Sequence, residues 1–203
     1  MNKNNNILNK VYKMFWVFFI GCIIGYIMEV SLHLIQTHSF QTRQGLIYGP
    51  FAPVYGLGML SFYLILPKIK HLYNIFFISA LLGGITEYLC SYFQERFFGT
   101  ISWDYSNLFM NINGRTSIMY CVLWGILGIV FIKIVYPYLE KVFDRIKINL
   151  ITKAVTTFAV LFMIFNISIS SMAAKRQYER RKKIAAENQI DVFLDKYYPD
   201  EFM

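Results

Sequence analysis

Long apolar runs separated by short polar stretches dominate this chain and limit the folds open to it. Crossing ~30 Å of hydrocarbon takes about 20 helical residues. Met14–Ile35, Tyr73–Phe93 and Ser117–Tyr138 reach that length, and Lys153–Met172 does so with Thr, Ser and Asn interspersed. Only 16% of the residues are charged, whereas about a quarter are charged in soluble domains. The chain is therefore predicted to be an integral membrane protein.

A further apolar run, Phe51–Leu66, is shorter than the others. It fits a full span, a tilted span or a re-entrant helix. The sequence predicts an all-α, polytopic transmembrane helix bundle with about five membrane segments in residues 1–172 and structured polar loops on one face. Residues 173–203 are predicted to form a basic, partly helical tail. The tail fits either a solvated helix or one whose basic residues hold anionic lipid headgroups.

The placement of Lys and Arg bears on orientation, because cytoplasmic flanks of membrane helices are enriched in both. With five crossings, ten of these residues fall on each side. The first helix usually dominates orientation, which favours a cytoplasmic N-terminus. The abundance of Ile, Asn, Lys, Tyr and Phe is typical of AT-rich bacterial genomes, so we expect a multi-pass protein of a bacterial cell membrane. The basic residues flank spans, which argues against a nucleic-acid partner.

Two polar loops are expected to meet at one membrane surface. Gln36–Gly49 follows the first span and Gln94–Thr116 follows the third, so an even number of crossings separates them. Two glutamates, Glu29 and Glu87, lie toward the ends of their spans that meet these loops. Carboxylates at membrane depth are costly unless paired or hydrated, so both are expected to face the bundle interior. We predict an arginine near each.

The charges near these loops form a near-balanced set. Four carboxylates (Glu29, Glu87, Glu95 and Asp104) face three arginines (Arg43, Arg96 and Arg115). This balance fits an internal network that closes one end of the bundle, and equally a pocket for a polar or zwitterionic solute. Within the second loop we expect Asp104 and Arg115 to pair, with Asn113 in the turn between them.

The segment "RQGLIYGPFAPVYGLG", from Arg43 to Gly58, contains four glycines and two prolines and cannot be regular helix throughout. Irregular backbone at membrane depth is tolerated where protein buries it or where it lines a cavity. The alternative is a surface loop before a proline-started helix. The candidate substrate-binding or polar-network residues are Glu29, Arg43, Tyr48, Tyr55, Glu87, Ser91, Glu95, Trp103, Asp104, Tyr105, Asn113 and Arg115.

The sequence motifs of several common enzyme classes are absent. The chain contains no GxxxxGK[ST], HExxH or GxSxG motif, so it offers no ATP-binding loop or common hydrolase motif of its own. The three cysteines fall inside predicted spans without metal-ligand spacing. We therefore expect neither a cofactor nor a metal, and an enzymatic role is the less favoured one.

The chain resembles the CmpB-type family of small bacterial ABC-transporter permeases. The resemblance rests on Glu29, on "YGPFAPVYG", on Glu87 with Ser91, on "FGTISWDYS" and "NINGR", and on Trp124-Gly125. Gln44 separates Arg43 from Gly45 where the family has glycine directly after arginine, and Asn166 stands where an acidic residue is expected. The second departure puts a transport role for the last span in doubt.

The resemblance implies a permease or solute-binding membrane subunit whose ATPase is a separate chain. Its partners would be membrane lipid, that ATPase subunit and a solute that the sequence does not identify. Two other functions stay open. One is an intramembrane enzyme that acts on lipid or cell-wall precursors with a carboxylate as general base. The other is an accessory membrane protein that transports nothing.

Overall fold

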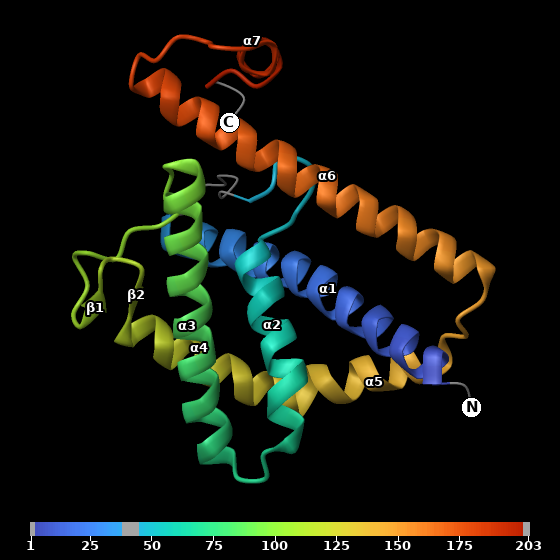
Figure 1. Cartoon of the computed structure of the whole chain (residues 1–203). Helices are drawn as coiled ribbons and strands as arrows, with labels where there is room; N and C mark the ends of the chain where they lie inside the picture. The colour runs from blue at the N-terminus through green and yellow to red at the C-terminus, as the bar shows by residue number, and fades with distance from the viewer. Residues whose placement is uncertain (1–2, 38–44, 201–203) are drawn as a thin grey trace.

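The computed structural model describes residues 3–37 and 45–200, with the side chains of residues 7–35 and 45–200. Its elements are α1 (Lys3–Thr37), α2 (Pro53–Ile65), the 3₁₀ turn η1 (Leu66–Lys68), α3 (Leu72–Phe98), β1 (Asn111–Ile112), β2 (Thr116–Ser117), α4 (Ile118–Val130), the π-helical η2 (Phe131–Val135), α5 (Tyr136–Arg145), α6 (Leu150–Arg181) and α7 (Gln189–Tyr197). The predicted all-α, polytopic bundle is confirmed (Figure 1).

Four helical stretches in the described part of the chain have the length and composition to cross a membrane: Ile7–Ile35, Leu72–Phe98, Ile118–Arg145 and Leu150–Arg181. The third combines α4, η2 and α5, which follow one another without a break. The short run Phe51–Leu66 contains α2, whose 13 residues extend about 20 Å. α2 by itself is therefore too short to cross the hydrocarbon as a helix.

The irregular segment before α2 enters the bundle alongside α1. The backbone N–H of Ala52 donates to the carbonyl of Cys22, in the middle of α1. Pro53 occupies the first turn of α2, where its missing N–H costs no hydrogen bond. Residues 45–52 are thus irregular, and the helix α2 follows them.

Close packing of α1 against α2 depends on small residues. A Cβ on Gly25 would overlap the ring of Tyr55, and one on Gly21 would lie 2.9 Å from Cβ of Met59. Without side chains at these two positions, the helices approach closely, as in small-xxx-small contacts between membrane helices. The Gly21–Gly25 spacing therefore serves packing.

The main apolar core lies where the first five helices meet. Its buried residues include Val17, Phe62, Trp124, Phe131 and Phe143. α6 lies at the side of this core, along α1 (Figure 1), and contributes Met163 to a smaller cluster with Cys22 and Phe51. Many of its other side chains are exposed, as expected of a lipid-facing helix.

The bundle has two distinct ends. At the N-terminal end, the ammonium of Lys13 on α1 lies 2.9 Å from a carboxylate oxygen of Glu140 on α5, and the hydroxyl of Tyr63 on α2 donates to Glu140 at 2.8 Å. At the hairpin end lie β1 and β2, the C-terminal ends of α3 and α6, and α7 (Figure 1). Gly99, which ends α3, lies against the ring of Tyr178 on α6.

The described parts of both polar loops lie at this hairpin end. Residues 45–49 contact α6, and residues 99–117 lie beside the C-terminal end of α3. Residues 38–44 of the first loop, with Arg43, fall outside the described residues. The structure thus agrees with the expectation that the two loops share one face of the bundle.

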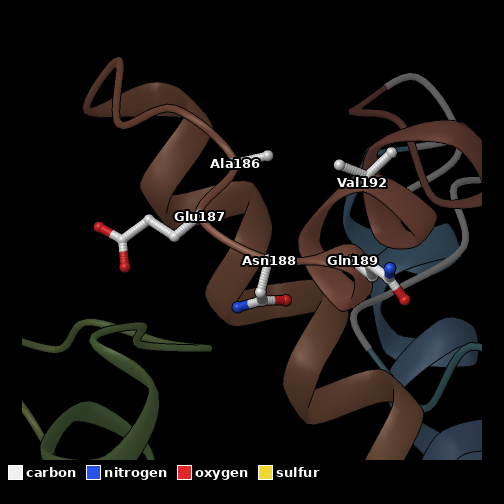
Figure 2. Close-up of a pocket in the computed structure, with 5 residues that line it drawn as sticks. All are labelled: Ala186, Glu187, Asn188, Gln189 and Val192. Carbon is white, nitrogen blue, oxygen red and sulfur yellow. The ribbon is translucent and has the colours of Figure 1, made fainter.

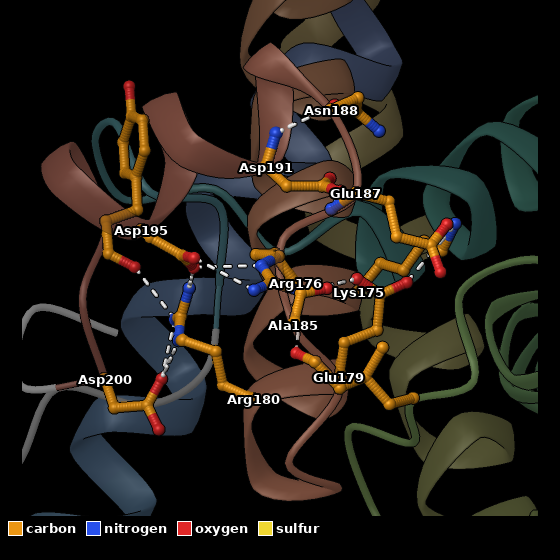
Figure 3. A network of polar contacts seen from close by, with 12 residues as sticks. Lys175, Arg176, Glu179, Arg180, Ala185, Glu187, Asn188, Asp191, Asp195 and Asp200 are labelled. Carbon is orange, nitrogen blue, oxygen red and sulfur yellow. Dashed lines mark hydrogen bonds and ion pairs between the residues drawn. The ribbon is translucent and has the colours of Figure 1, made fainter.

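The tail folds back onto α6. After Arg181 the chain turns at Lys183, whose φ is +60°, and α7 packs Leu194 and Tyr198 against Ile169 and Ala173. The guanidinium of Arg176, 3% exposed, donates to both carboxylate oxygens of Asp195 at 2.9 Å, and Arg180 bonds the same carboxylate (Figure 3). We call this set of contacts, completed by Glu179 and Asp200, the tail clasp.

Charge pairing keeps the clasp ionised over a wide pH range. The bonds from Arg176, opposed by burial and reinforced by Arg180, lower the pKa of Asp195 to about 2. A carboxylate with a depressed native pKa contributes stability above its unfolded pKa, about 3.9, and loses it as the pH falls through the native value. The contribution of Asp195 is therefore fully present above about pH 5 and lost toward pH 2.

Candidate functional site

Glu87 is a buried carboxylate near the hairpin end of α3. Its side chain is 6% exposed. Thr116, at the end of the hairpin, donates its hydroxyl to a carboxylate oxygen of Glu87 at 3.0 Å, and the indole of Trp124 lies within hydrogen-bonding reach. Gly83, one turn earlier, leaves the space into which Trp124 packs. The hairpin, α3 and α4 together thus position this carboxylate.

No lysine or arginine within the described residues forms an ion pair with Glu87. The arginine predicted within salt-bridge or water-bridged reach of Glu87 therefore forms no direct ion pair with it among these residues, and Arg43 lies outside them. The neighbours of Glu87 are hydroxyl and indole donors, and the second carboxylate, Glu29 on α1, is close enough to interact electrostatically with it.

Aromatic rings surround this carboxylate. The rings of Tyr55 and Trp124 have centroids 5.5 Å apart, and those of Tyr105 and Tyr120 stack at 4.0 Å. Burial raises the pKa of Tyr105, and the nearby charge of Glu87 adds to the effect. We call the region formed by Glu29, Glu87, Thr116 and these four aromatic residues (Tyr55, Tyr105, Tyr120 and Trp124) the Glu87 chamber.

Arg115 closes the chamber from the loop side. Its guanidinium lies 2.5 Å from a carboxylate oxygen of Glu95 and donates to the hydroxyl of Ser91 at 3.3 Å. It also lies over the rings of Tyr88 and Tyr92, at 5.8 and 5.6 Å from their centroids. These contacts come from one face of α3, and they fix the hairpin against that helix.

The loop before the hairpin is folded by its own polar groups. The indole N–H of Trp103 donates to the carbonyl of Arg115 at 2.9 Å. Asn113 and Gly114 adopt positive φ angles of 51° and 68° in the turn between the two strands, and the amide of Asn113 donates to the hydroxyl of Tyr88. The stretch is therefore an ordered cap.

Asp104 has a different partner from the one predicted. Its carboxylate accepts from the backbone N–H of Ser106 at 2.9 Å and from the hydroxyl of the same residue at 2.5 Å. These bonds lower the pKa of Asp104. Arg115 pairs with Glu95 instead, so the predicted Asp104–Arg115 pair is wrong. An aspartate two residues before a serine finds that local partner without any long-range contact.

The corrected pairing predicts a specific pattern of coupling. In a double-mutant cycle on thermal stability, Arg115→Ala and Glu95→Ala are expected to couple by up to about 1 kcal/mol, the range for exposed ion pairs, because Glu95 is half exposed. Arg115→Ala with Asp104→Ala should couple less. A larger coupling for the Asp104 cycle would contradict the assigned contacts.

The irregular segment before α2 is held by α6. The backbone N–H of Tyr48 donates to Oδ1 of Asn166 at 3.1 Å, and Nδ2 of Asn166 donates to the carbonyl of Tyr48 at 2.6 Å. The N–H of Ile47 donates to the hydroxyl of Ser170 at 2.9 Å. Asn166 is fully buried. It thus satisfies backbone groups that have no helical partner, as irregular backbone at membrane depth requires.

Residues 16–171 of the chain match a family model described as "Putative ABC-transporter type IV", the CmpB type. The chain belongs to this family. The match covers more than half of the chain and includes the apolar helices of a multi-pass membrane protein. No curated protein and no solved structure matches the chain.

The candidate site residues that lie within the described chain separate into four groups in the structure. Glu29, Tyr55, Glu87 and Tyr105 belong to the chamber, whereas Ser91, Glu95, Trp103, Asn113 and Arg115 belong to the cap above it. Tyr48 lies apart from both groups. Its backbone is bonded to α6, and its hydroxyl is 2.6 Å from that of Tyr198. Asp104 bonds only within its own loop.

Sequence reasoning did not select Thr116, Tyr120, Trp124 or Asn166 as site residues. Trp124 had a signal, since Trp124-Gly125 is part of the CmpB resemblance. Thr116 follows Arg115 directly but carries no charge that would single it out. The sequence marked Asn166 only as a departure from the family pattern, yet Asn166 makes both hydrogen bonds to the backbone of Tyr48.

A surface groove lies beside Thr116, at the edge of the chamber. It has a volume of about 310 Å³ and is lined by the hairpin and the start of α4, including Asn111, Thr116, Ser117 and Cys121. Cys121 lies 3.7 Å from the hydroxyl of Thr116, which itself bonds Glu87. The described residues include no group of three His, Cys, Asp or Glu side chains placed to hold a metal ion.

Proposed function

We propose that this CmpB-family protein is the membrane subunit of an ABC-type transporter and that the Glu87 chamber binds its solute. The observation that carries the proposal is the buried carboxylate of Glu87, which has hydroxyl and indole partners and no basic one within the described residues. Intramembrane ionisable residues are costly and typically mark a solute or ion pathway.

The chamber's chemistry favours a cationic solute. Two carboxylates supply negative charge, and the rings of Tyr55, Tyr105, Tyr120 and Trp124 supply faces that attract cations. A buried cation–ring contact contributes about 2 kcal/mol, whereas an anion would meet the carboxylate of Glu87, which has no basic partner within the described residues. An organic ammonium compound satisfies both kinds of group at once. The aromatic rings also make a dry surface for its apolar part.

The ATPase would be a separate chain that docks at the N-terminal end. The sequence contains no phosphate-binding loop of its own. At that end α5 and the connection Glu140–Lys153 present exposed Lys141, Arg145 and Lys147 beside the buried Phe143. The first helix usually dominates orientation, which favours a cytoplasmic location for this end. The hairpin end would then face outward.

Solute binding can be tested on the purified chain in detergent by following its thermal stability with a panel of solutes. The panel should contain primary and quaternary ammonium compounds, neutral sugars, and carboxylates of matched size. We expect ammonium compounds to raise the unfolding temperature, because a ligand at 100 times its Kd adds about 2.7 kcal/mol. The anionic compounds should add nothing.

Glu87→Gln is the informative variant, since the amide keeps the size of the side chain and removes its charge. It should lose the stabilisation by ammonium compounds while still folding. Glu95→Gln provides the control, because Glu95 lies in the cap and pairs with Arg115. Equal stabilisation of wild type and Glu87→Gln by every active solute would overturn the assignment of the chamber.

A further inference from the structure

We propose that α7 and the basic turn before it bind the surface of a membrane that contains anionic lipids. The proposal is independent of the solute site. It starts from a face of α7 that the rest of the described chain leaves uncovered. Ile190, Phe193 and Tyr197 follow the i, i+3, i+7 spacing of one helix face, and they are 57%, 47% and 53% exposed. Leu194, one turn after Ile190 and beside this face, is buried against α6.

The position of α7 along α6 says what covers this face. The 32 residues of α6 extend about 48 Å, more than the ~30 Å hydrocarbon layer. Exposed apolar residues continue along α6 through Phe158 and Phe165 to Met172, and the exposed Lys175 follows. Leu194 packs on Ile169 and Ala173. α7 therefore lies where the lipid-facing surface of α6 gives way to charge.

The direction of α7 fits the same location. Figure 1 shows α7 end-on while α6 runs across the view, so the short helix lies across α6. A helix across a membrane-spanning helix lies in the plane of the membrane surface. An apolar face with aromatic residues is typical of helices that rest at the headgroup boundary.

The charges around α7 select the kind of lipid. Arg176 and Arg180 are paired within the tail clasp (Figure 3). Arg181, Lys182 and Lys183 in the following turn are exposed, and no ion pair joins them to an acidic side chain within the described residues. Lysines and arginines this close to a membrane surface attract anionic headgroups.

The other edge of α7 is polar and makes a matched control. A groove of about 380 Å³ lies there, lined by Ala186, Glu187, Asn188, Gln189 and Val192 (Figure 2). The side chain of Asn188 caps the start of α7 by accepting from the N–H of Asp191. Glu187 points away from the groove in Figure 2. An acidic side chain at this edge is unsuited to an anionic surface.

Lipid binding by α7 would also support the irregular segment before α2. The hydroxyl of Tyr198, just after α7, lies 2.6 Å from that of Tyr48, and Ile47 packs on the Leu194 cluster. The pKa of Tyr198 is raised to about 12, chiefly by the hydrogen bond with Tyr48, so the pair stays neutral at physiological pH. A surface-bound α7 would therefore hold this segment in place.

Photo-crosslinking of the full chain in lipid nanodiscs tests the proposal. Benzoylphenylalanine replaces Phe193 in one variant and Glu187 in the other, in nanodiscs of three parts zwitterionic to one part anionic phospholipid. We expect lipid adducts at position 193 and few at position 187. The anionic lipid should exceed its one-quarter share among the adducts. Intact-mass spectrometry identifies each adduct.

Neutralising the basic turn completes the test. The double variant Lys182→Gln, Lys183→Gln should lower the ratio of anionic to zwitterionic adducts at position 193, by about fivefold for each lysine that lies at the surface. Phe193 is exposed, so its replacement leaves the packing of Leu194 intact. Equal yields at positions 187 and 193, adducts to a second copy of the chain in place of lipid, or enrichment that survives the double variant would each overturn the proposal.

Discussion

Replacing Arg176 with alanine is expected to release the C-terminal tail from α6. The guanidinium of Arg176 makes two bonds to Asp195 and further bonds to Glu179 and to the carbonyls of Ile184 and Ala185. Removing one member of a buried pair costs ~3–5 kcal/mol, because the survivor loses its partner. Asp195 is 32% exposed, so we expect about 3 kcal/mol. Hydrogen exchange of residues 184–198 measures the release.

A change of about 3 kcal/mol corresponds to a rise of roughly 100-fold in the exchange rate of α7 amides. Lys175→Ala is the matched control one position away. The Lys175 ammonium lies 3.5 Å from Glu179 and is 55% exposed, so its loss should cost less than about 0.5 kcal/mol. Similar exchange rates for the two variants would show that the clasp does not hold the tail.

Asn166→Ala is expected to destabilise the segment before α2. The substitution removes an acceptor from the N–H of Tyr48 and a donor from its carbonyl. Each buried backbone group left without a partner costs about 1–3 kcal/mol, so the two together cost roughly 2–6 kcal/mol. The thermal stability of the purified protein should fall accordingly. The exchange of residues 45–52 should increase before that of the helices.

Ile164→Ala controls for the effect of shortening a side chain on α6. Ile164 is 59% exposed on a lipid-facing helix, so its loss should change stability by about 0.5 kcal/mol or less. A stability loss in Asn166→Ala no larger than in Ile164→Ala would mean that the segment is held by other contacts.

The helical architecture follows from the sequence because hydrocarbon imposes a length and a composition on each spanning helix. The runs that begin at Met14, Tyr73, Ser117 and Lys153 all lie in helices long enough to span. The short run around α2 left three alternatives open, because its length alone fits each of them. Its actual path depends on a hydrogen bond between Ala52 and Cys22, which no local pattern encodes.

The candidate site was predictable as a set of residues more than as a set of contacts. Glu87 stands out in any apolar helix, since a carboxylate there needs a polar environment. The partner of Glu87 depends on the rotation of α3 about its axis and on the register of the hairpin beside it. The hairpin aligns Thr116 with Glu87 and carries Arg115 onward to Glu95 and Ser91. Charge counting could not distinguish these alternatives, because every arginine was equally available to every carboxylate.

The tail clasp had no detectable signal in the sequence. Residues 173–203 contain basic and acidic side chains that suit a solvated helix equally well. Arg176 and Asp195 lie 19 positions apart, and they meet because the chain reverses at Lys183. The sequence does not predict this turn, since lysine rarely adopts a positive φ. Only the folded chain relates the two charges.

The central claim is that the Glu87 chamber is a negatively charged site open to cations, and the native Cys121 reports on it directly. The thiol lines the groove beside Thr116, and the hydroxyl of Thr116 in turn donates a hydrogen bond to Glu87. The measurement compares the rates at which two methanethiosulfonate reagents of similar size modify Cys121. One carries a trimethylammonium group and the other a sulfonate. Peptide mass spectrometry locates the adducts, so the other cysteines need not be replaced.

Relative to their rates with a free thiol, we predict that the cationic reagent reacts about tenfold faster than the anionic one. A unit charge roughly 8 Å from a carboxylate at an effective dielectric constant of 20 gains about 2 kcal/mol, and water in the groove reduces this. Glu87→Gln should bring the ratio close to one, whereas Glu95→Gln should leave it unchanged. A ratio that is the same in wild type and Glu87→Gln, or a Cys121 that neither reagent reaches, would contradict the account.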